Sequence, residues 1–192
     1  MSQTGISFAQ FQGVEGHWAQ EQILKWLDKG WVELSEDGRF YPDAKITREE
    51  FIVLANKAFG FEDETRVEKV AMEVAAENVS GAGNSNFSAD EYIGRIEVIA
   101  IITRIANLPL PESSTILNQF KDNEEISEWG KAYVAAAVNI GIVNGYPDGS
   151  FRPYEHVSKA EAITVLNRVI EKVTKPGVLV GEPGLVDSGS TN

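Results

Sequence analysis

One pattern of turn and helix residues occurs twice in this chain, and the two copies lie 111 positions apart. Residues 37–50 contain an Asp-Gly turn, a Phe-x-Pro step and a Thr-x-x-Glu helix start, and residues 148–161 contain the same turn and step before a Ser-x-x-Glu start. The pairs Trp18 and Trp129, and Gly30 and Gly141, keep the same separation. A repeat with this content covers two helices and the loop between them, so it predicts repeated helix-loop-helix units.

A third, weaker copy lies between these two. Phe87 follows Phe40 by 47 positions, and residues 93–97 follow residues 46–50 by the same number. We therefore predict an all-α fold of three helix-loop-helix repeats, which span residues 11–61, 62–108 and 120–174, with a linker at 109–119. Residues 1–10 are small and polar, and residues 175–192 are rich in Gly, Pro and Ser, so both are expected to be flexible ends, the second leading toward a larger parent protein.

The second helix of each repeat has a recognisable start. Thr47 with Glu50, and Ser158 with Glu161, fit the capping box, in which a hydroxyl and a carboxylate accept hydrogen bonds from backbone N–H groups. The three second helices are therefore predicted to begin near Thr47, Gly94 and Ser158. Apolar residues at helical spacing predict the core. The side chains expected to be mostly buried are Trp18, Trp26, Phe51, Leu54, Trp129, Tyr133, Ile163 and Leu166.

The composition excludes several functions. The chain has 192 residues, a net charge of −12 and no cysteine. Nucleic-acid binding draws on clustered Lys and Arg, so it is not expected. No apolar run reaches the roughly 20 residues that span a bilayer, and the residues indicate neither a cofactor nor a metal site. The same negative charge repels polyanions, so an anionic ligand would need local positive sites.

Each second helix carries a cation in its first turn, at Arg48, Arg95 and Lys159. The helix dipole disfavours a positive charge there by roughly 0.3 to 1 kcal/mol, so another interaction is needed to explain it. One hypothesis is a salt bridge to a neighbouring carboxylate. The other is an anion site, because free N–H groups at a helix N-terminus and a guanidinium beside them bind carboxylates or phosphates.

From about Phe11 to Val173 these motifs resemble the S-layer homology (SLH) domain, whose pattern runs through a His-Trp pair, a Gly-Tyr-x-Asp-Gly loop and a Thr-Arg-x-Glu helix start. The resemblance implies a pseudo-threefold arrangement of three SLH repeats around a central helical bundle. It also implies an extracellular protein at the cell wall surface. Such a chain would anchor a larger parent protein or an S-layer lattice by binding pyruvylated secondary cell wall polysaccharide, with a terminal sugar such as pyruvylated ManNAc, in grooves between repeats.

The resemblance assigns binding roles to particular residues. Arg48 and Arg95 match the signature Arg that would grip the ketal carboxylate, whereas Lys159 keeps the charge and loses the planar fork. Asp37 is the loop Asp of the first repeat, and small polar residues at 80–86 replace the loop in the second. The sugar-contacting loop is complete only in the third repeat, as Gly145, Tyr146, Asp148 and Gly149.

Other functions stay open at this point. A glycosidase would need two carboxylates, but caps and turns account for the carboxylates, and neither His17 nor His156 pairs with a candidate nucleophile, so no enzyme is expected. Calcium binding would use residues 122–125, although the full EF-hand spacing is absent. A protein–protein interaction module of a surface assembly would use an exposed apolar patch on the stacked helices.

Overall fold

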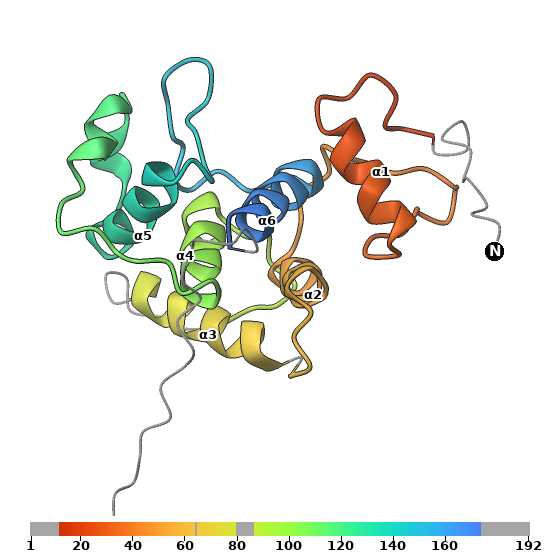
Figure 1. Cartoon of the computed structure of the whole chain (residues 1–192), viewed down its shortest axis with the longest axis horizontal. Helices are drawn as coiled ribbons and strands as arrows, with labels where there is room; N and C mark the ends of the chain where they lie inside the picture. Colours follow the sequence, from red (N-terminus) through yellow and green to blue (C-terminus); the bar gives the residue numbers. More distant parts are fainter. Residues whose placement is uncertain (1–11, 64, 80–86, 174–192) are drawn as a thin grey trace, which may run out of the picture.

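The computed structural model describes residues 12–63, 65–79 and 87–173 (Figure 1). The predicted flexible ends at 1–10 and 175–192, and the small polar loop at 80–86, lie outside the described residues. Within the described part the chain forms helices and isolated bridges but no strand, which confirms the all-α prediction. The elements are α1 (Gln20–Asp28), α2 (Arg48–Phe59), α3 (Thr65–Val79), α4 (Arg95–Ile105), η2 (Thr115–Gln119), η3 (Asn123–Glu125), α5 (Glu128–Asn139) and α6 (Lys159–Val173).

Thr47, Gly94 and Ser158 directly precede α2, α4 and α6. Thr47 Oγ1 accepts from the N–H of Glu50 at 3.2 Å, and the Glu50 carboxylate accepts from the Thr47 N–H at 2.9 Å. Ser158 and Glu161 exchange the same two hydrogen bonds, at 3.2 and 2.9 Å. Gly94 has no side chain to offer. The start of α4 therefore keeps only the half of the box in which the carboxylate three residues later accepts from the Gly94 N–H at 2.9 Å.

Three backbone hydrogen bonds join the repeats in a closed circuit. The N–H of Ile93 donates to the carbonyl of Ile46 at 3.1 Å, that of Val157 donates to Ile93 at 3.1 Å, and that of Ile46 donates to Val157 at 3.0 Å. These residues occupy the same position in the three repeats, one before the helix cap, and all are buried. The circuit gives the repeats a pseudo-threefold arrangement.

The same symmetry supplies partners for the helix N-termini. The first two N–H groups of each second helix have no acceptor within their own helix, and all of them donate to carbonyls of a neighbouring repeat. The bonds at the first position are Arg48 to Glu91, Arg95 to Glu155 and Lys159 to Ala44, at 3.0, 3.0 and 2.9 Å. Each second helix therefore depends on the adjacent repeat for its first turn.

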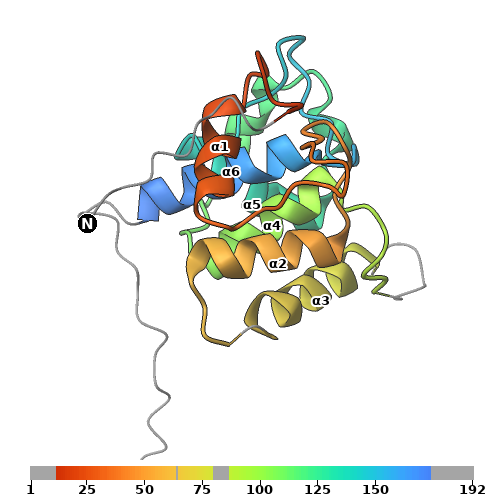
Figure 2. The same ribbon diagram turned by 90° about the vertical axis from the view of Figure 1, so that its right-hand side faces the viewer.

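The first helix of each repeat packs on the second helix of a different repeat. α1 packs on α6, α3 on α2 and α5 on α4, and α3 also packs on α4 of its own repeat. Figure 2 shows α1 beside α6, and α3 beside α2. At the centre, α2 and α4 both contact α6. Every residue of α4 is buried except Arg104, so this helix lies deepest in the core.

Most of the predicted core is confirmed. The buried members are Trp26, Phe51, Leu54, Ile163 and Leu166, and the partly buried ones are Trp129 and Tyr133. The prediction for Trp18 is wrong, because its side chain is 62% exposed. Trp18 precedes the first residue of α1, so it does not share the apolar face that this helix buries through Ile23, Leu24 and Trp26.

Gly130 of α5 sets how closely this helix approaches α4. A Cβ atom at Gly130 would lie 2.3 Å from Cδ1 of Ile96 on α4. Gly130→Ala is therefore expected to lower the free energy of unfolding by about 1 to 3 kcal/mol, although Ala favours an isolated helix over Gly by about 1 kcal/mol. Urea unfolding measures the change, with Asn139→Ala at the exposed end of α5 as the control. A stabilised Gly130→Ala variant would contradict this packing.

Candidate functional site

The first-turn cation of each repeat faces the capping carboxylate of another repeat. The three pairs are Arg48–Glu97, Arg95–Glu161 and Lys159–Glu50, with nitrogen–oxygen distances of 3.1, 3.8 and 3.6 Å. These pairs repeat the threefold circuit of the backbone at the level of side chains. The salt-bridge hypothesis therefore applies to all three cations, but to different degrees.

The anion-site hypothesis is wrong in one respect. It relied on free N–H groups at the N-termini of α2, α4 and α6. The first two N–H groups of each of these helices already donate to carbonyls of a neighbouring repeat. An anion beside these cations would therefore have to be held by side chains.

Arg48 has its hydrogen-bond donors in use. It donates to both carboxylate oxygens of Glu97, at 3.1 and 3.3 Å, to Glu91 at 2.8 Å and to the carbonyl of Ser88 at 3.1 Å. Burial alone would lower the pKa of Arg48, but the bonds to Glu91 and Glu97 outweigh burial and raise it. The surrounding groove of about 440 Å³, termed the Arg48 groove, also contains Asp90. Three carboxylates beside one guanidinium disfavour an anionic ligand.

Arg95 has donor capacity left over. One Nη atom donates to the carbonyl of Asn144 at 2.8 Å, and the guanidinium lies 4.8 and 5.2 Å from the ring centroids of Tyr146 and Phe151. The Nε of Arg95 is buried and has no hydrogen-bond partner among the described residues. Its Nη1 lies 3.8 Å from Oε1 of Glu161. A buried donor without an acceptor is costly, so an added acceptor oxygen would stabilise this side chain.

Tyr146 lies against Arg95 in the loop of the third repeat. Its hydroxyl donates to Glu161 at 2.7 Å, and it does so to the carboxylate oxygen that lies nearest to Arg95. Burial, and then this hydrogen bond, raise the pKa of Tyr146 to about 12. Tyr146 is therefore a neutral hydrogen-bond donor at ordinary pH. The Glu161 carboxylate interacts with both Tyr146 and Arg95.

The remaining loop residues shape the turn. A Cβ atom at Gly145 would lie 2.6 Å from the ring of Phe120, so only glycine fits there. Gly149 has a φ of 81°, in the left-handed region that favours glycine. The Asp148 carboxylate accepts from both the hydroxyl and the N–H of Ser150, and these bonds hold its pKa below the usual range.

Asp122, one of the residues considered for calcium, holds the end of this loop. Its two carboxylate oxygens accept from the N–H groups of Phe151 and Arg152, each at 2.7 Å. Across residues 12–63, 65–79 and 87–173, no three His, Cys, Asp or Glu side chains come together in a way that could hold a metal ion. Asp122 therefore positions the backbone that follows Tyr146.

A groove of about 640 Å³ surrounds Arg95, and three cations line it. Each of them donates to a neutral backbone carbonyl. The bonds are Arg95 to Asn144, Lys45 to His156 and Arg168 to Ile142, at 2.8, 2.7 and 3.2 Å. The groove carboxylates have shorter contacts elsewhere: Asp43 lies 3.3 Å from His17, Glu155 pairs with Arg152 at 3.1 Å, and Glu161 accepts from Tyr146 at 2.7 Å, whereas Arg95 approaches Glu161 only to 3.8 Å. Positive charge in this groove, termed the Arg95 groove, is therefore less neutralised than in the Arg48 groove.

The structure brings only some of the predicted site residues together. The Arg95 groove contains Arg95, Gly145 and Tyr146, together with the capping residues Ser158 and Glu161. The other predicted residues lie outside its lining, and they are Asp37, Arg48, Lys159, Asp148 and Gly149. Asp37 accepts a hydrogen bond from the Tyr41 hydroxyl, which lowers the pKa of Asp37. Lys159 lies with Glu50 in a third groove of about 400 Å³, termed the Lys159 groove.

Two cations of the Arg95 groove were missed by sequence reasoning, and they are Lys45 from the first repeat and Arg168 from α6. Lys45 reaches the groove through its bridge to Ser158 of the third repeat, a contact that no motif reports. Trp18, which was predicted to be buried, also lines the groove.

Two regions of the chain, residues 14–52 and 119–163, match the family described as the S-layer homology domain. They lie largely within the first and third repeats, and they include Arg48 and Lys159 with their capping residues. The chain therefore contains two regions that match the SLH domain family.

Curated relatives extend this similarity over most of the chain. The chain is 28% identical over 177 residues to an amylopullulanase of Thermoanaerobacterium thermosulfurigenes, a match that covers 84% of this chain and 10% of the relative. It is 33% identical over 127 residues to a surface layer protein of Brevibacillus choshinensis, covering 62% and 11%. It is 25% identical over 158 residues to a cellulosome-anchoring protein of Acetivibrio thermocellus, covering 82% and 25%. The chain thus spans a quarter or less of these relatives. In the described part of the chain, no helix has the length and apolarity to cross a membrane.

The contrast between Arg48 and Lys159 predicts different stability effects at equivalent positions. Arg48→Ala leaves the Glu97 side chain, which is 7% exposed, without its charge partner, so the free energy of unfolding should fall by about 1.5 to 3 kcal/mol. Lys159→Ala removes a longer pair in which Glu50 is 46% exposed, so the loss should not exceed about 1 kcal/mol. Urea unfolding of both variants tests this. Equal losses would contradict the different use of the two cations.

Proposed function

We propose that this chain anchors a larger surface protein to the bacterial cell wall by binding pyruvylated secondary cell wall polysaccharide in the Arg95 groove. Anchoring is supported by the two regions that match the SLH domain and by relatives named as surface layer and cellulosome-anchoring proteins. This role places the chain outside the cell, at the surface of the wall. Beyond anchoring, we propose that the ligand is a polysaccharide that carries a pyruvate ketal.

The observation that carries the proposal is the set of three cations in the Arg95 groove that each donate to a neutral carbonyl, with Glu161 no closer to Arg95 than 3.8 Å. A ketal carboxylate is a fixed negative charge, and a guanidinium binds such a group through charge-assisted hydrogen bonds. Arg95 has a buried Nε without an acceptor in the described part of the chain. Lys45 and Arg168 add positive charge along the same lining. This local charge offsets the repulsion that the net charge of −12 exerts on an anion.

Trp18 suits the uncharged part of the ligand. Its exposed ring lines the Arg95 groove, and an indole offers an apolar face on which a sugar ring can stack. His17 fixes this segment, because its Nδ1 accepts from the Ala19 N–H at 3.1 Å while its Nε2 lies 3.3 Å from Asp43. We therefore assign the carboxylate of the ligand to Arg95 and its sugar face to Trp18.

The proposed role is binding without catalysis. Among the groove carboxylates, Glu161 accepts from the Ser158 N–H and from Tyr146, and Glu155 pairs with Arg152. Both carboxylates are therefore accounted for by structural contacts within the chain. Two relatives carry the enzyme names amylopullulanase and exoglucanase, but the matches span only 10% and 16% of those proteins. The matched part therefore supports an attachment module.

Arg95→Gln should weaken the binding of this chain to isolated cell wall that carries the pyruvylated polymer. Loss of a charge-assisted hydrogen bond costs about 1.5 to 3 kcal/mol, which corresponds to roughly tenfold to hundredfold weaker binding. Cosedimentation with the cell wall measures the change in binding affinity. Arg66→Gln removes the same charge from α3, outside the lining of the Arg95 groove, and should bind as the wild type does.

Binding to cell wall from which the ketal has been removed tests the role of the ligand carboxylate separately from the role of Arg95. The wild-type chain should be retained on untreated wall and lost from ketal-free wall. Equal retention on both would remove the carboxylate from the mechanism, and unchanged binding by a folded Arg95→Gln variant would remove Arg95 from the site. Circular dichroism establishes that the variant is folded.

A further inference from the structure

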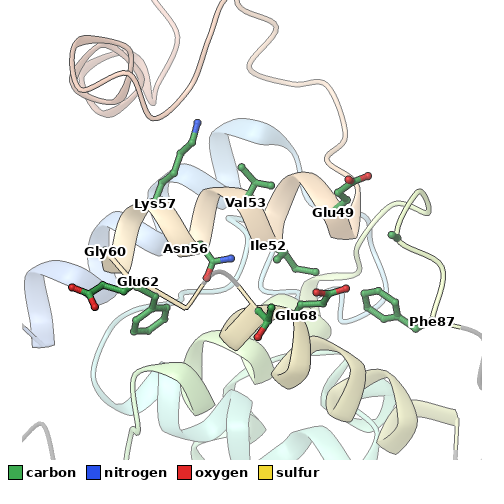
Figure 3. Close-up of a pocket in the computed structure, with 12 residues that line it drawn as sticks. Glu49, Ile52, Val53, Asn56, Lys57, Gly60, Glu62, Glu68 and Phe87 are labelled. Atoms are coloured by element: carbon green, nitrogen blue, oxygen red, sulfur yellow. The ribbon is translucent and has the colours of Figure 1, made fainter.

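Helix α2 lies between two hollows that the proposed polysaccharide site does not use. One hollow, of about 640 Å³, lies between α2 and the start of α3, and Ile52, Phe61 and Phe87 are among its lining residues (Figure 3). The other is the Lys159 groove between α2 and α6, which includes Trp31. Val53 of α2 lines both hollows and is 46% exposed. Val53 and the two hollows are termed the α2 face.

Both hollows offer apolar side chains to an occupant. Between α2 and α3, Ile52 and Asn56 point toward α3, with Phe87 at one end (Figure 3). In the Lys159 groove the apolar lining residues are Trp31, Val32, Phe40, Ile46, Val53, Leu54 and Ile163. An exposed apolar residue between two apolar hollows marks a place where a partner can bury surface.

The α2 face carries more negative than positive charge, because five glutamates and two lysines line its hollows. Four of its carboxylates make no hydrogen bond or ion pair with any residue in the described part of the chain, and they are Glu33, Glu49, Glu62 and Glu68. Figure 3 shows Glu49 and Glu62 at opposite ends of the hollow beside α3, with Glu68 between them. The two cations of the face only partly offset this charge: Lys57 donates to the carbonyl of Trp31, and Lys159 pairs with Glu50 at 3.6 Å.

We propose that the α2 face docks a basic segment of another protein, which places an apolar side chain in each hollow and lysines or arginines against the free carboxylates. The apolar lining would supply the buried contacts, and the four carboxylates would select the charge of the partner and speed its approach. This binding is separate from the polysaccharide site, since none of the four carboxylates lines the Arg95 groove. One chain could then hold the wall and a second surface protein together.

Two other occupants fit this face less well. A second copy of the chain carries the same net charge of −12, so the long-range field opposes self-association through an acidic face. A sugar would need an exposed aromatic platform. Among the described residues, the most exposed aromatic ring is that of Trp18 at 62%, which lines the Arg95 groove, whereas Trp31 of the α2 face is only partly exposed.

The test uses the full chain and two synthetic helical peptides. One peptide has Leu at helical spacing (i, i+3, i+4, i+7) and Lys at the flanking positions, so that ammonium groups border its apolar face, and the other has Glu in place of Lys. In ¹⁵N NMR titrations the Lys peptide should shift the amide signals of α2 and of the start of α3, and the Glu peptide should not. The double variant Glu49→Gln, Glu68→Gln should bind the Lys peptide about fivefold more weakly, because each exposed charge pair contributes only a small factor.

A matched control separates docking from general attraction to an acidic protein. The double variant Glu124→Gln, Glu125→Gln removes two charges at η3, away from the lining of both hollows, and should bind the Lys peptide as the wild type does. Equal weakening in the two double variants would overturn the proposal, because only net charge would matter. Val53→Ser should also weaken binding, and unchanged affinity would contradict an apolar contact at this face.

A titration with a cationic carbohydrate completes the experiment. An oligomer of glucosamine carries amines without a protein backbone, and we expect it to leave the signals of the α2 face unchanged. Binding of this oligomer at α2 without binding of the Lys peptide would replace the protein partner with a cationic sugar. The Glu49→Gln, Glu68→Gln variant should keep wild-type retention on cell wall, so failure at the α2 face and failure at the Arg95 groove give different results.

Discussion

The first turns of α2, α4 and α6 have backbone N–H groups that their own helices cannot satisfy, and carbonyls of neighbouring repeats accept from them. The rest of the structure depends on this exchange. A repeat on its own would leave these groups without a partner, and it would also lose the helix that packs from another repeat. The closed circuit through Ile46, Ile93 and Val157 therefore makes the three repeats a single folding unit.

The exchange also explains why three related grooves have different chemistry. Each cation lies beside the capping carboxylate of another repeat, so a small change in the neighbouring loop decides whether that cation is neutralised. Glu91 and Ser88 complete the shell of Arg48, whereas Tyr146 shares the carboxylate beside Arg95. Symmetry thus fixes where the grooves lie, and the local partners decide which ligand each one suits.

Local signals carried most of what could be predicted from the sequence. The repeat spacing and the capping pairs, such as Thr47 with Glu50, gave the helix starts, because caps act within a few residues of the chain. The partners of Arg48 depend on contacts between repeats, and no local pattern reports these. The same limit applies to Lys45 and Arg168, which meet at the Arg95 groove from distant parts of the sequence.

The central claim is that one of the three grooves, the Arg95 groove, retains the charge to bind an anionic sugar. Titration calorimetry with a soluble pyruvylated sugar tests it directly, because the binding curve gives the number of sites for each chain. We expect one site. Two or three sites of similar affinity would contradict the account, since the Arg48 and Lys159 grooves would then bind the carboxylate in spite of the acidic side chains that line them.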